Sequence, residues 1–306
     1  MADGTAREIG EFALIARVVE RLGTSPSVLL GPGDDAAVVR VPDGRVVATT
    51  DVLVEGVHFR RDWSTAYDVG RKAAAANLAD VAAMGATATA LLVGLVAPAD
   101  LPVAWAVGLA DGLRDEAALV GAVVVGGDTV SGRQLVVSVT ALGDLAGRAP
   151  VTRSGARVGD VVVVGGPLGA SAAGLALLES GVVHGPLVDL HRRPSPAYAL
   201  GPVLAAHGAT SMCDVSDGLA VDLGHLATAS GVAMGIDTVA VPRWAGVSLE
   251  QALYGGEDHV LVATVPLGAV EALAALGVVG IGRVRAGHGV HDLEGNALVG
   301  GWEHFA

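Results

Sequence analysis

The sequence predicts a two-domain protein of the α/β or α+β class. Apolar runs rich in valine, typical of buried strands, alternate with alanine-rich segments of helical spacing along the whole chain. Near the middle, residues 146–160 form a polar, glycine-bearing segment without periodicity. Because 306 residues are enough for two domains of ordinary size, we expect this segment to separate a first domain, residues 1–146, from a second, residues 147–306.

The first domain is predicted to mix helices and strands joined by glycine-rich turns such as GPGDD and PDGR. Gly23 is the expected end of the first helix. Asp100 is the expected N-cap of the third helix, with Pro102 near its start. The expected helices lie within 10–23, 66–86 and 100–121, and the expected strands within 28–41, 45–59, 88–96, 122–130 and 134–145.

The second domain is predicted to alternate strand and helix more regularly than the first. Its opening strand is a run of four valines, which indicates burial on both faces. The expected strands lie within 161–166, 210–215, 232–242, 259–266 and 278–285, and the expected helices within 167–181, 195–208, 216–231, 248–256 and 268–277.

Composition excludes several classes of function. A formal charge of −13 and a pI near 5.0 argue against a nucleic-acid partner, which requires a basic surface. One cysteine, Cys213, excludes an intrachain disulfide and a cysteine metal cluster. No charge-free apolar run of membrane-spanning length occurs, so we expect a cytoplasmic protein with no membrane partner. The chain has a single lysine, Lys72, and no P-loop motif.

Acidic residues gather at the ends of the predicted strands, beside glycine, serine or threonine. Asp beside Gly is ordinary turn chemistry, and this is the simplest interpretation of any one such cluster. Asp80 is different, because it lies within an alanine-rich helix one turn from Asn77. Taken together, the carboxylates favour Mg²⁺, which prefers oxygen ligands, and their number suggests several ions. The acidic positions are Asp34, Asp35, Asp51, Asp80, Asp128, Asp214, Asp217, Glu257 and Asp258.

The segment SMCDVSDGLAVD, residues 211–222, holds three aspartates where a strand meets a helix. Two carboxylates about 4 Å apart repel each other by about 1–4 kcal/mol near a protein surface, so a cation is expected to offset the cost. Asp217 is either a helix cap or a metal ligand. Asp222 lies beyond the first helical turn, and we expect it neither to cap the helix nor to bind a ligand.

Two segments suggest a ligand with phosphate groups. Residues 161–174 read as strand, glycine loop and helix, which can present backbone N–H groups to an anion. The preceding segment supplies Arg148, Arg153 and Arg157, and arginine is suited to polyphosphate. A solvated surface position is the simpler interpretation of any one of these arginines.

Eight motifs in one order resemble the thiamine-monophosphate kinase family, from about residue 10 to residue 305. This family belongs to a superfamily with aminoimidazole ribonucleotide synthetase and selenophosphate synthetase. The motifs are GEFALIARVVERLG, LGPGDDAAVV, ATTDVLVEGVHF, AAANLADVAAMGA, VVVGGDTV, VTRSGARVGDVVVV, DVSDGLAVDLGHLA and YGGEDHVLVATVP.

The resemblance implies an aminoimidazole ribonucleotide synthetase-like fold with a β-rich N-terminal domain that dimerises, binds ATP and Mg²⁺, and a C-terminal α/β domain that completes the active-site cleft. It implies a homodimer that transfers phosphate from ATP to thiamine monophosphate, giving thiamine diphosphate with several Mg²⁺ ions. The acceptor phosphate has a second pKa of about 6 and is mostly ionised at neutral pH. We therefore expect direct in-line transfer with no general base and no phospho-enzyme.

The resemblance also assigns residues, motif by motif. The stacking of Trp302 on the cationic thiazolium ring is one such expectation, and Glu257 would complement the same charge. The implied metal ligands are Asp35, Thr49, Thr50, Asp51, Asp80, Asp128, Asp214 and Asp217; the implied nucleotide contacts are Gly127, Arg153 and Ser216; the implied substrate contacts are His58, Glu257 and Trp302.

Some positions depart from the family pattern, and some alternatives stay open. His259 stands where the family usually has an aromatic ring, and the position of Trp302 often carries tyrosine. The sequence does not decide between Asp34 and Asp35 as a ligand. Another ATP-dependent enzyme of the superfamily, or a non-catalytic module that binds Mg²⁺ and nucleotide, remains an alternative function.

Overall fold

The computed structural model describes residues 4–32 and 37–303, and the chain divides into two compact units. Unit 1 comprises Met1–Val81 and Thr87–Gly147, and unit 2 comprises Ala82–Ala86 and Arg148–Ala306. The boundary expected after residue 146 therefore lies one residue from this division. The short segment 82–86, which the sequence placed in the first domain, belongs to unit 2.

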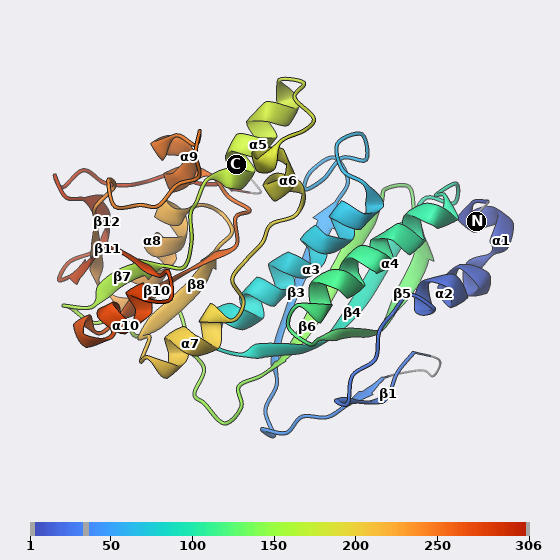
Figure 1. Cartoon of the computed structure of the whole chain (residues 1–306), viewed down its shortest axis with the longest axis horizontal. Coiled ribbons are helices and arrows are strands. Elements are labelled where there is room, and N and C mark those ends of the chain that lie inside the picture. The colour runs from blue at the N-terminus through green and yellow to red at the C-terminus, as the bar shows by residue number, and fades with distance from the viewer. Residues whose placement is uncertain (1–3, 33–36, 304–306) are drawn as a thin grey trace. The chain divides into compact units, whose positions relative to one another are not determined.

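Unit 1 is a mixed unit of helices and short and long strands (Figure 1). Its elements are α1 (Ala6–Ile9), α2 (Glu11–Val19), β1 (Val28–Leu30), β2 (Val38–Val39), β3 (Val47–Val54), α3 (Ala66–Ala83), β4 (Thr87–Ala97), α4 (Val103–Ala118), β5 (Val123–Ser131) and β6 (Val136–Asp144). The helix expected to end at Gly23 ends at Val19. The N-cap of α4 is Pro102 in extended conformation, so the expectation of Asp100 at that position is wrong.

Four strands of unit 1 form a sheet in the order β3-β6-β4-β5. Strands β5 and β6 follow each other in sequence but are not neighbours, because β4 lies between them. Helix α4 carries the chain from β4 to β5, and such a crossover makes those two strands parallel. Strand β6 then pairs antiparallel with both β3 and β4.

The two faces of this sheet have different surroundings. On the face toward α3 and α4, the side chains of Val137, Val139 and Ala141 are completely buried. Figure 1 shows these two helices side by side across that face. The opposite face exposes apolar side chains, with Val52 46% and Leu92 37% accessible.

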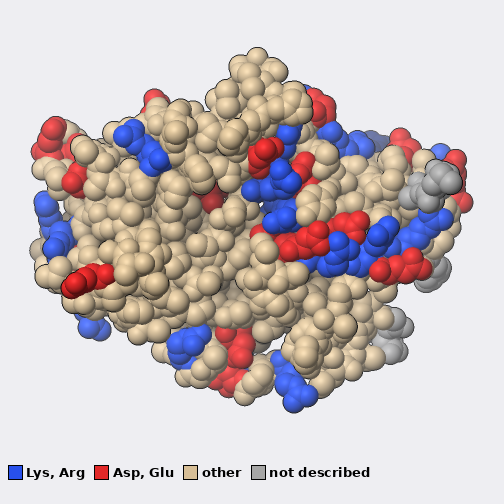
Figure 2. Space-filling view, in the orientation of Figure 1, with Lys and Arg blue, Asp and Glu red and all other residues tan. Residues whose placement is uncertain are grey.

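Helices α3 and α4 approach each other closely because glycines lie at their contact. A Cβ atom on Gly70 would lie 2.2 Å from the carbonyl oxygen of Leu109, and one on Gly112 would lie 2.2 Å from that of Tyr67. At this contact Arg71 forms an ion pair with the buried carboxylate of Glu116. Figure 2 shows acidic and basic side chains side by side over these helices.

Unit 2 has one six-stranded sheet in the order β12-β9-β11-β7-β10-β8, and helix α6 and strand β12 were not expected from the sequence. Its elements are β7 (Val161–Val164), α5 (Ala170–Glu179), α6 (Pro186–Arg192), α7 (Leu200–Ala206), β8 (Ser211–Val215), α8 (Leu219–Ser230), β9 (Ala233–Ile236), α9 (Leu249–Tyr254), β10 (Val260–Val265), the 3₁₀ helix η1 (Leu267–Ala269), α10 (Val270–Ala274), β11 (Val279–Arg285) and β12 (Gly289–Asp292).

The central strands of unit 2 are buried along their whole length. All four residues of β7 and all five of β8 are buried, which agrees with the continuous valine run read from the sequence. Cys213 on β8 is part of the core, together with Val164 and Leu223. Among the described residues, no helix is long and apolar enough to cross a membrane.

Candidate functional site

One group of predicted ligands meets where β3 faces α3, and we call Thr49, Asp51, Asn77 and Asp80 the N-terminal oxygen cluster. Thr49 Oγ1 donates a hydrogen bond of 2.6 Å to Asp80 Oδ2. The backbone N–H of Asp51 donates a hydrogen bond of 3.1 Å to Asn77 Oδ1. The first bond joins two predicted ligand side chains, and the second joins the backbone of β3 to the Asn77 amide.

The periods of the two elements explain this meeting. Alternate residues of a strand face the same side, so Thr49 and Asp51 both face α3. Asn77 and Asp80 are three residues apart and share one face of the helix. The buried Asn77 also donates to Ala73 O at 3.0 Å, which fixes its amide with the oxygen toward β3.

Two other predicted ligands do not join this cluster. Thr50 faces the opposite side of the sheet, where its hydroxyl donates to Val139 O at 3.0 Å and lies 3.1 Å from Thr140 Oγ1. Asp128 lies on β5, the edge strand on the other side of the sheet from β3. Across the sheet, the residue of β5 level with Asp51 is Gly127, and Asp128 is the next residue. Three interstrand spacings separate those edges, about 14 Å.

Gly127 precedes Asp128 at a point where β5 passes very close to β4. A Cβ atom there would lie 1.9 Å from the carbonyl oxygen of Val93, so only glycine fits. The glycine of the GGDT motif therefore has a packing role within unit 1.

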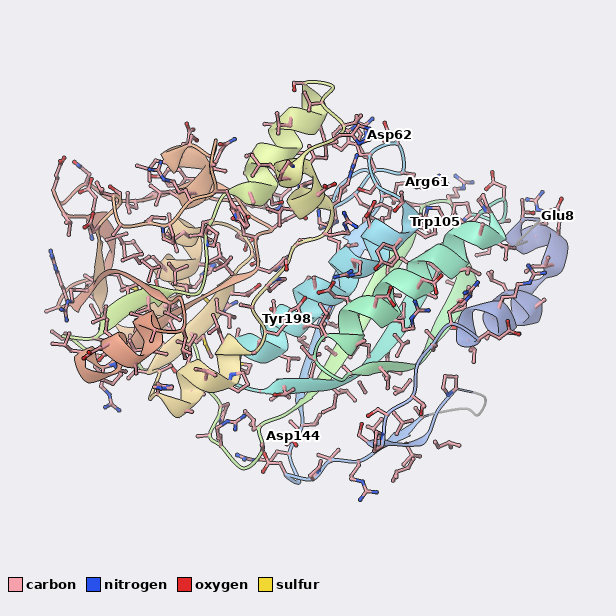
Figure 3. The ribbon with its side chains drawn as sticks, in the orientation of Figure 1. Glu8, Arg61, Asp62, Trp105, Asp144 and Tyr198 are labelled. Atoms are coloured by element: carbon pink, nitrogen blue, oxygen red, sulfur yellow. The ribbon has the colours of Figure 1, made fainter. Side chains whose placement is uncertain are left out.

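The segment after β3 fixes His58, a predicted substrate contact. The Val54 N–H donates to His58 Nδ1 at 3.1 Å, so a neutral ring carries its proton on Nε2. Lys72 Nζ donates to His58 O at 3.0 Å. The next residue, Phe59, is buried with its ring centroid 6.5 Å from that of Trp105 on α4, which is labelled in Figure 3.

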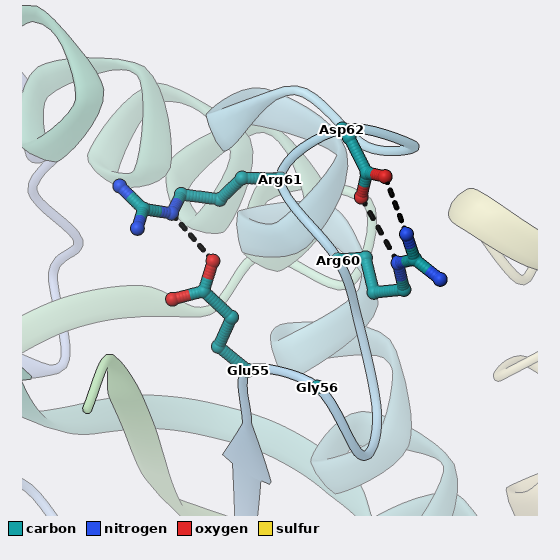
Figure 4. A pocket seen from close by; sticks show the side chains of 5 residues that line it. All are labelled: Glu55, Gly56, Arg60, Arg61 and Asp62. Carbon is teal, nitrogen blue, oxygen red and sulfur yellow. Dashed lines mark hydrogen bonds and ion pairs between the residues drawn. The ribbon is translucent and has the colours of Figure 1, made fainter.

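A cavity of about 510 Å³ lies beside this segment and is lined by charged side chains. Arg61 Nε donates to Glu55 Oε1 at 2.5 Å, and Arg60 binds both carboxylate oxygens of Asp62 (Figure 4). The Arg60 guanidinium also lies 4.1 Å from the centroid of the Trp63 ring. The surface of the loop that carries His58 thus bears paired charges.

A second group lies where β8 meets α8, and we call Asp214, Asp217, Asp222 and His225 the C-terminal acidic cluster. One ligand atom from each of Asp217, Asp222 and His225 lies within 4.8 Å of the others. His225 was not predicted. The sequence could have indicated it, because His225 follows Asp222 by three residues and the two side chains therefore share one face of α8.

Asp222 has a structural role that was not expected from the sequence. Its Oδ2 accepts hydrogen bonds of 3.1 Å from the N–H groups of Asp217 and Gly218, so it closes the loop that starts α8. Burial, opposed by these bonds and reinforced by the charges of Asp214 and Asp217, raises the pKa of Asp222 to about 7. Asp217 makes no such cap, because the N-cap of α8 is Gly218 and no side chain caps it.

The motif YGGEDH runs alongside the loop that carries this cluster. The Glu257 N–H donates to Ser216 O at 2.7 Å, and the His259 N–H donates to Val215 O at 2.9 Å. Gly256 makes this approach possible, since a Cβ atom on it would lie 2.4 Å from Ser216 O. Both Glu257 and His259 have positive φ, 63° and 53°, a conformation that costs energy and concentrates at functional sites.

The glycine loop before α5 does not hold its N–H groups ready for a phosphate as expected. Gly169 N and Ser171 N donate to the carboxylate of Asp258, at 2.5 and 3.0 Å. Burial raises the pKa of Asp258, although these hydrogen bonds oppose the shift. The start of α5 is therefore already bonded to an acidic side chain of unit 2.

Glu257, a predicted substrate contact, lies beside a buried histidine of α6. His191 Nδ1 is 3.9 Å from Glu257 Oε2 and 2.9 Å from Ser171 Oγ. The Glu257 side chain is 33% exposed, so its carboxylate is accessible while its neighbours are buried.

The remaining predicted contacts are distributed around unit 2. The Trp302 N–H donates to Asp217 O at 2.9 Å, and its side chain is 57% exposed. Arg153 is exposed, and its carbonyl oxygen accepts a hydrogen bond from Ser230 Oγ. Asp34 and Asp35 lie outside the described residues.

The oxygen atoms of both clusters fit a hard divalent cation, whereas the imidazole of His225 is not a ligand that Mg²⁺ prefers. Carboxylate, hydroxyl and amide oxygens are the ligands that Mg²⁺ prefers. The mutual repulsion of Asp214, Asp217 and Asp222 is part of what raises the pKa of Asp222, and a cation at this position would relieve it.

Without bound metal, we predict that Asp222 makes the protein less stable as the pH rises from about 4 to about 7. Its folded-state pKa of about 7 lies above the ordinary value of 3.8, so unfolding in this range releases a proton. Asp222→Asn should raise the free energy of unfolding at pH 8 by up to about 4 kcal/mol, at about 1.4 kcal/mol per pKa unit, and change it little at pH 4.

Urea denaturation in EDTA at several pH values measures this effect. The control is Asp189→Asn, which removes a half-exposed carboxylate of α6 and should keep the wild-type slope. An Asp222→Asn variant with an unchanged pH slope would contradict the prediction.

Comparisons with known proteins agree with the resemblance read from the motifs. Family models described as AIR synthase related protein match along the chain, the N-terminal domain over residues 33–145 and the C-terminal domain over residues 157–292. The chain is 50% identical over 317 residues to the thiamine-monophosphate kinase of Mycobacterium tuberculosis H37Rv, covering 98% of this chain and 93% of that protein.

Solved structures show the same two-domain fold, which confirms the predicted fold class. The crystal structure of thiamine-monophosphate kinase from Stenotrophomonas maltophilia K279a has a TM-score of 0.82 at 34% identity, covering 94% of this chain and 96% of that one. AaThiL complexed with AMPPCP and TMP has a TM-score of 0.80 at 34% identity, covering 98% of both chains. The chain therefore belongs to the thiamine-monophosphate kinase family of AIR synthase related proteins.

Proposed function

We propose that this chain phosphorylates thiamine monophosphate with ATP, giving thiamine diphosphate and ADP. The observation that carries the proposal is the likeness along the full chain to AaThiL, whose structure is complexed with AMPPCP and TMP. AMPPCP is an ATP analogue, so the two ligands of that protein correspond to the two substrates of the proposed reaction. We also propose a cytoplasmic location, and cell fractionation tests it.

The residues of the chain fit a transfer without a general base. The acceptor oxygen belongs to a phosphate monoester whose second pKa is about 6, so it is mostly ionised at neutral pH. What the protein has to supply is alignment of two polyanions and neutralisation of their charge. We therefore propose direct in-line transfer, and a covalent phospho-enzyme formed from γ-labelled ATP would contradict it.

We propose that carboxylates of both clusters hold Mg²⁺ during the reaction. When bound, Mg²⁺ neutralises phosphate oxygens and orients them. Thr49, Asp51 and Asp80 are the proposed ligands of the N-terminal oxygen cluster, already aligned by the hydrogen bond from Thr49 to Asp80. The proposed ligands elsewhere are Asp35, Thr50, Asp128, Asp214 and Asp217.

Two of the proposed nucleotide contacts, Gly127 and Ser216, are sequence neighbours of the proposed ligands Asp128 and Asp217. Glu257 and Trp302 both bond through their backbone N–H groups to the loop that holds Asp217. Glu257 is placed to complement a cationic ring with its exposed carboxylate. His58 is the third proposed substrate contact. Gly127, Arg153 and Ser216 are the proposed nucleotide contacts.

Turnover with defined acceptors tests the proposed function. Wild-type protein with Mg²⁺ and ATP should convert thiamine monophosphate to thiamine diphosphate, measured by chromatography. Asp51→Asn should lower kcat at least 100-fold, because a lost electrostatic contact of this kind costs about 2.7–4 kcal/mol. The matched control is Asp43→Asn, whose carboxylate pairs with Arg45. Turnover of free thiamine instead of its monophosphate would refute the proposal.

Trp302→Ala should raise the KM for thiamine monophosphate while leaving that for ATP unchanged. Stacking of an indole on a cationic ring contributes about 0.5–2 kcal/mol, which corresponds to roughly a 2- to 30-fold change. Trp302→Phe should give an intermediate KM because it keeps an aromatic face. Steady-state kinetics with each substrate varied measures this, and an unchanged KM in Trp302→Ala would remove the stacking contact.

We also propose that the chain acts as a homodimer joined through the sheet of unit 1. The face opposite α3 and α4 carries the exposed apolar side chains Val52, Leu92 and Val130, each on a different strand and in a different row of the sheet. Asp128 lies on the same face but at the edge far from Asp51. A second copy that covers this face would bury the apolar residues.

Leu92→Asp should shift the protein from dimer to monomer and lower kcat. A charge in the middle of an apolar contact has no partner there and cannot be buried without a large penalty. Light scattering coupled to size-exclusion chromatography measures the mass. The control is Val239→Asp, at a position in unit 2 that is already 87% exposed. A wild-type chain that elutes as a monomer would overturn the proposed dimer.

A further inference from the structure

His259 forms a buried hydrogen bond to a proposed metal ligand. Its Nδ1 atom lies 2.9 Å from Asp214 Oδ2, and the two side chains are only 10% and 6% exposed. An ionised carboxylate can only accept hydrogen bonds, so the imidazole must donate. The bond therefore assigns the proton of this ring to Nδ1.

The backbone around His259 fixes the direction from which the ring reaches Asp214. The His259 N–H donates to Val215 O, the residue next to Asp214 on β8. Its φ of 53° lies in the left-handed region, where histidine, asparagine and aspartate are enriched among non-glycine residues. The backbone of His259 is thus fixed at the end of β8, and burial of the side chain, only 10% exposed, restricts the ring.

We propose that His259 is a positioning residue that orients the Asp214 carboxylate for binding a divalent cation. The proposal rests on the proposed function of Asp214 as a metal ligand. Holding Oδ2 leaves Oδ1 as the oxygen offered to the cation. Groups that hydrogen-bond to metal ligands fix the geometry of those ligands, and losing one typically weakens metal binding 10- to 100-fold.

The His259 ring supplies a hydrogen-bond donor that an apolar ring would not. A phenylalanine ring would leave Asp214 Oδ2 without this donor. Asp258, the preceding residue, bonds to Gly169 N and Ser171 N at the start of α5. The two adjacent side chains thus bond to different elements, and only His259 bonds to β8.

Two amide variants separate the hydrogen bond from the volume of the ring. In His259→Asn the side-chain nitrogen takes nearly the place of Nδ1, and asparagine tolerates a positive φ. In His259→Gln the nitrogen lies nearer the place of Nε2, and in His259→Phe there is no donor. Binding of Mn²⁺, used as a probe for Mg²⁺, is measured on the full chain by the loss of the free-ion EPR signal.

We expect His259→Gln and His259→Phe to raise the Kd for Mn²⁺ about 10-fold or more, with His259→Asn within about 3-fold of wild type. Nitrogen-15 NMR of labelled histidine should show an Nδ1–H signal that disappears in His259→Asn, in addition to that of His207, whose Nδ1 donates to Val203 O. Thermal unfolding in EDTA checks folding. If His259→Phe does not fold, the two amide variants carry the comparison.

Three results would overturn the proposal. The first is wild-type Mn²⁺ affinity in both His259→Gln and His259→Phe. The second is an affinity of His259→Asn as weak as that of His259→Gln, and the third is an Nε2–H tautomer. Wild-type protein that binds no Mn²⁺ would instead refute the proposed metal site, and with it the role of His259. Because the measurement needs no turnover, a failure of the proposed kinase activity is seen separately.

Discussion

Two backbone hydrogen bonds, from Glu257 N to Ser216 O and from His259 N to Val215 O, hold the acidic region of unit 2 together. They bring a segment with two left-handed residues against a loop whose carboxylates repel each other. The two bonds lie where β8 ends and β10 begins, next to the pairing of Val215 with Val260. The close approach depends on the absence of a side chain at Gly256, which explains why the motif needs glycine before its acidic residues.

In unit 1, regular elements bring the polar side chains together. A strand and a helix with different periods place hydroxyl, amide and carboxylate groups at one contact, and small alanine side chains let the elements approach. The resulting bonds of Thr49 and Asn77 keep the polar atoms ordered before any ligand arrives. An ordered group loses less entropy when it binds, so the arrangement favours affinity for a cation.

The sequence predicted the class of fold, most strands and the acidic motifs, because these depend on local spacing. It did not predict that β4 lies between β5 and β6, which depends on pairing between distant strands. The sequence analysis also assigned no role to Asp222, and it predicted that the N–H groups at the start of α5 are available to bind an anion. In both places a carboxylate of unit 2 accepts hydrogen bonds from backbone N–H groups. The sequence of one strand-to-helix junction does not show which carboxylate its N–H groups will bond. His225 lies in the acidic cluster because it is one helical turn after Asp222 on α8.

The single lysine of the chain has a further consequence. Lys72 is 3% exposed, and its ammonium group is bonded to the carbonyl oxygen of His58. Reagents and enzymes that acylate or otherwise modify lysine side chains therefore find none on the folded surface. Regulation of this protein by lysine acetylation, or its attachment to a support through lysine, would require unfolding of α3. Arginine, which such reagents do not modify, supplies every other basic side chain apart from histidine.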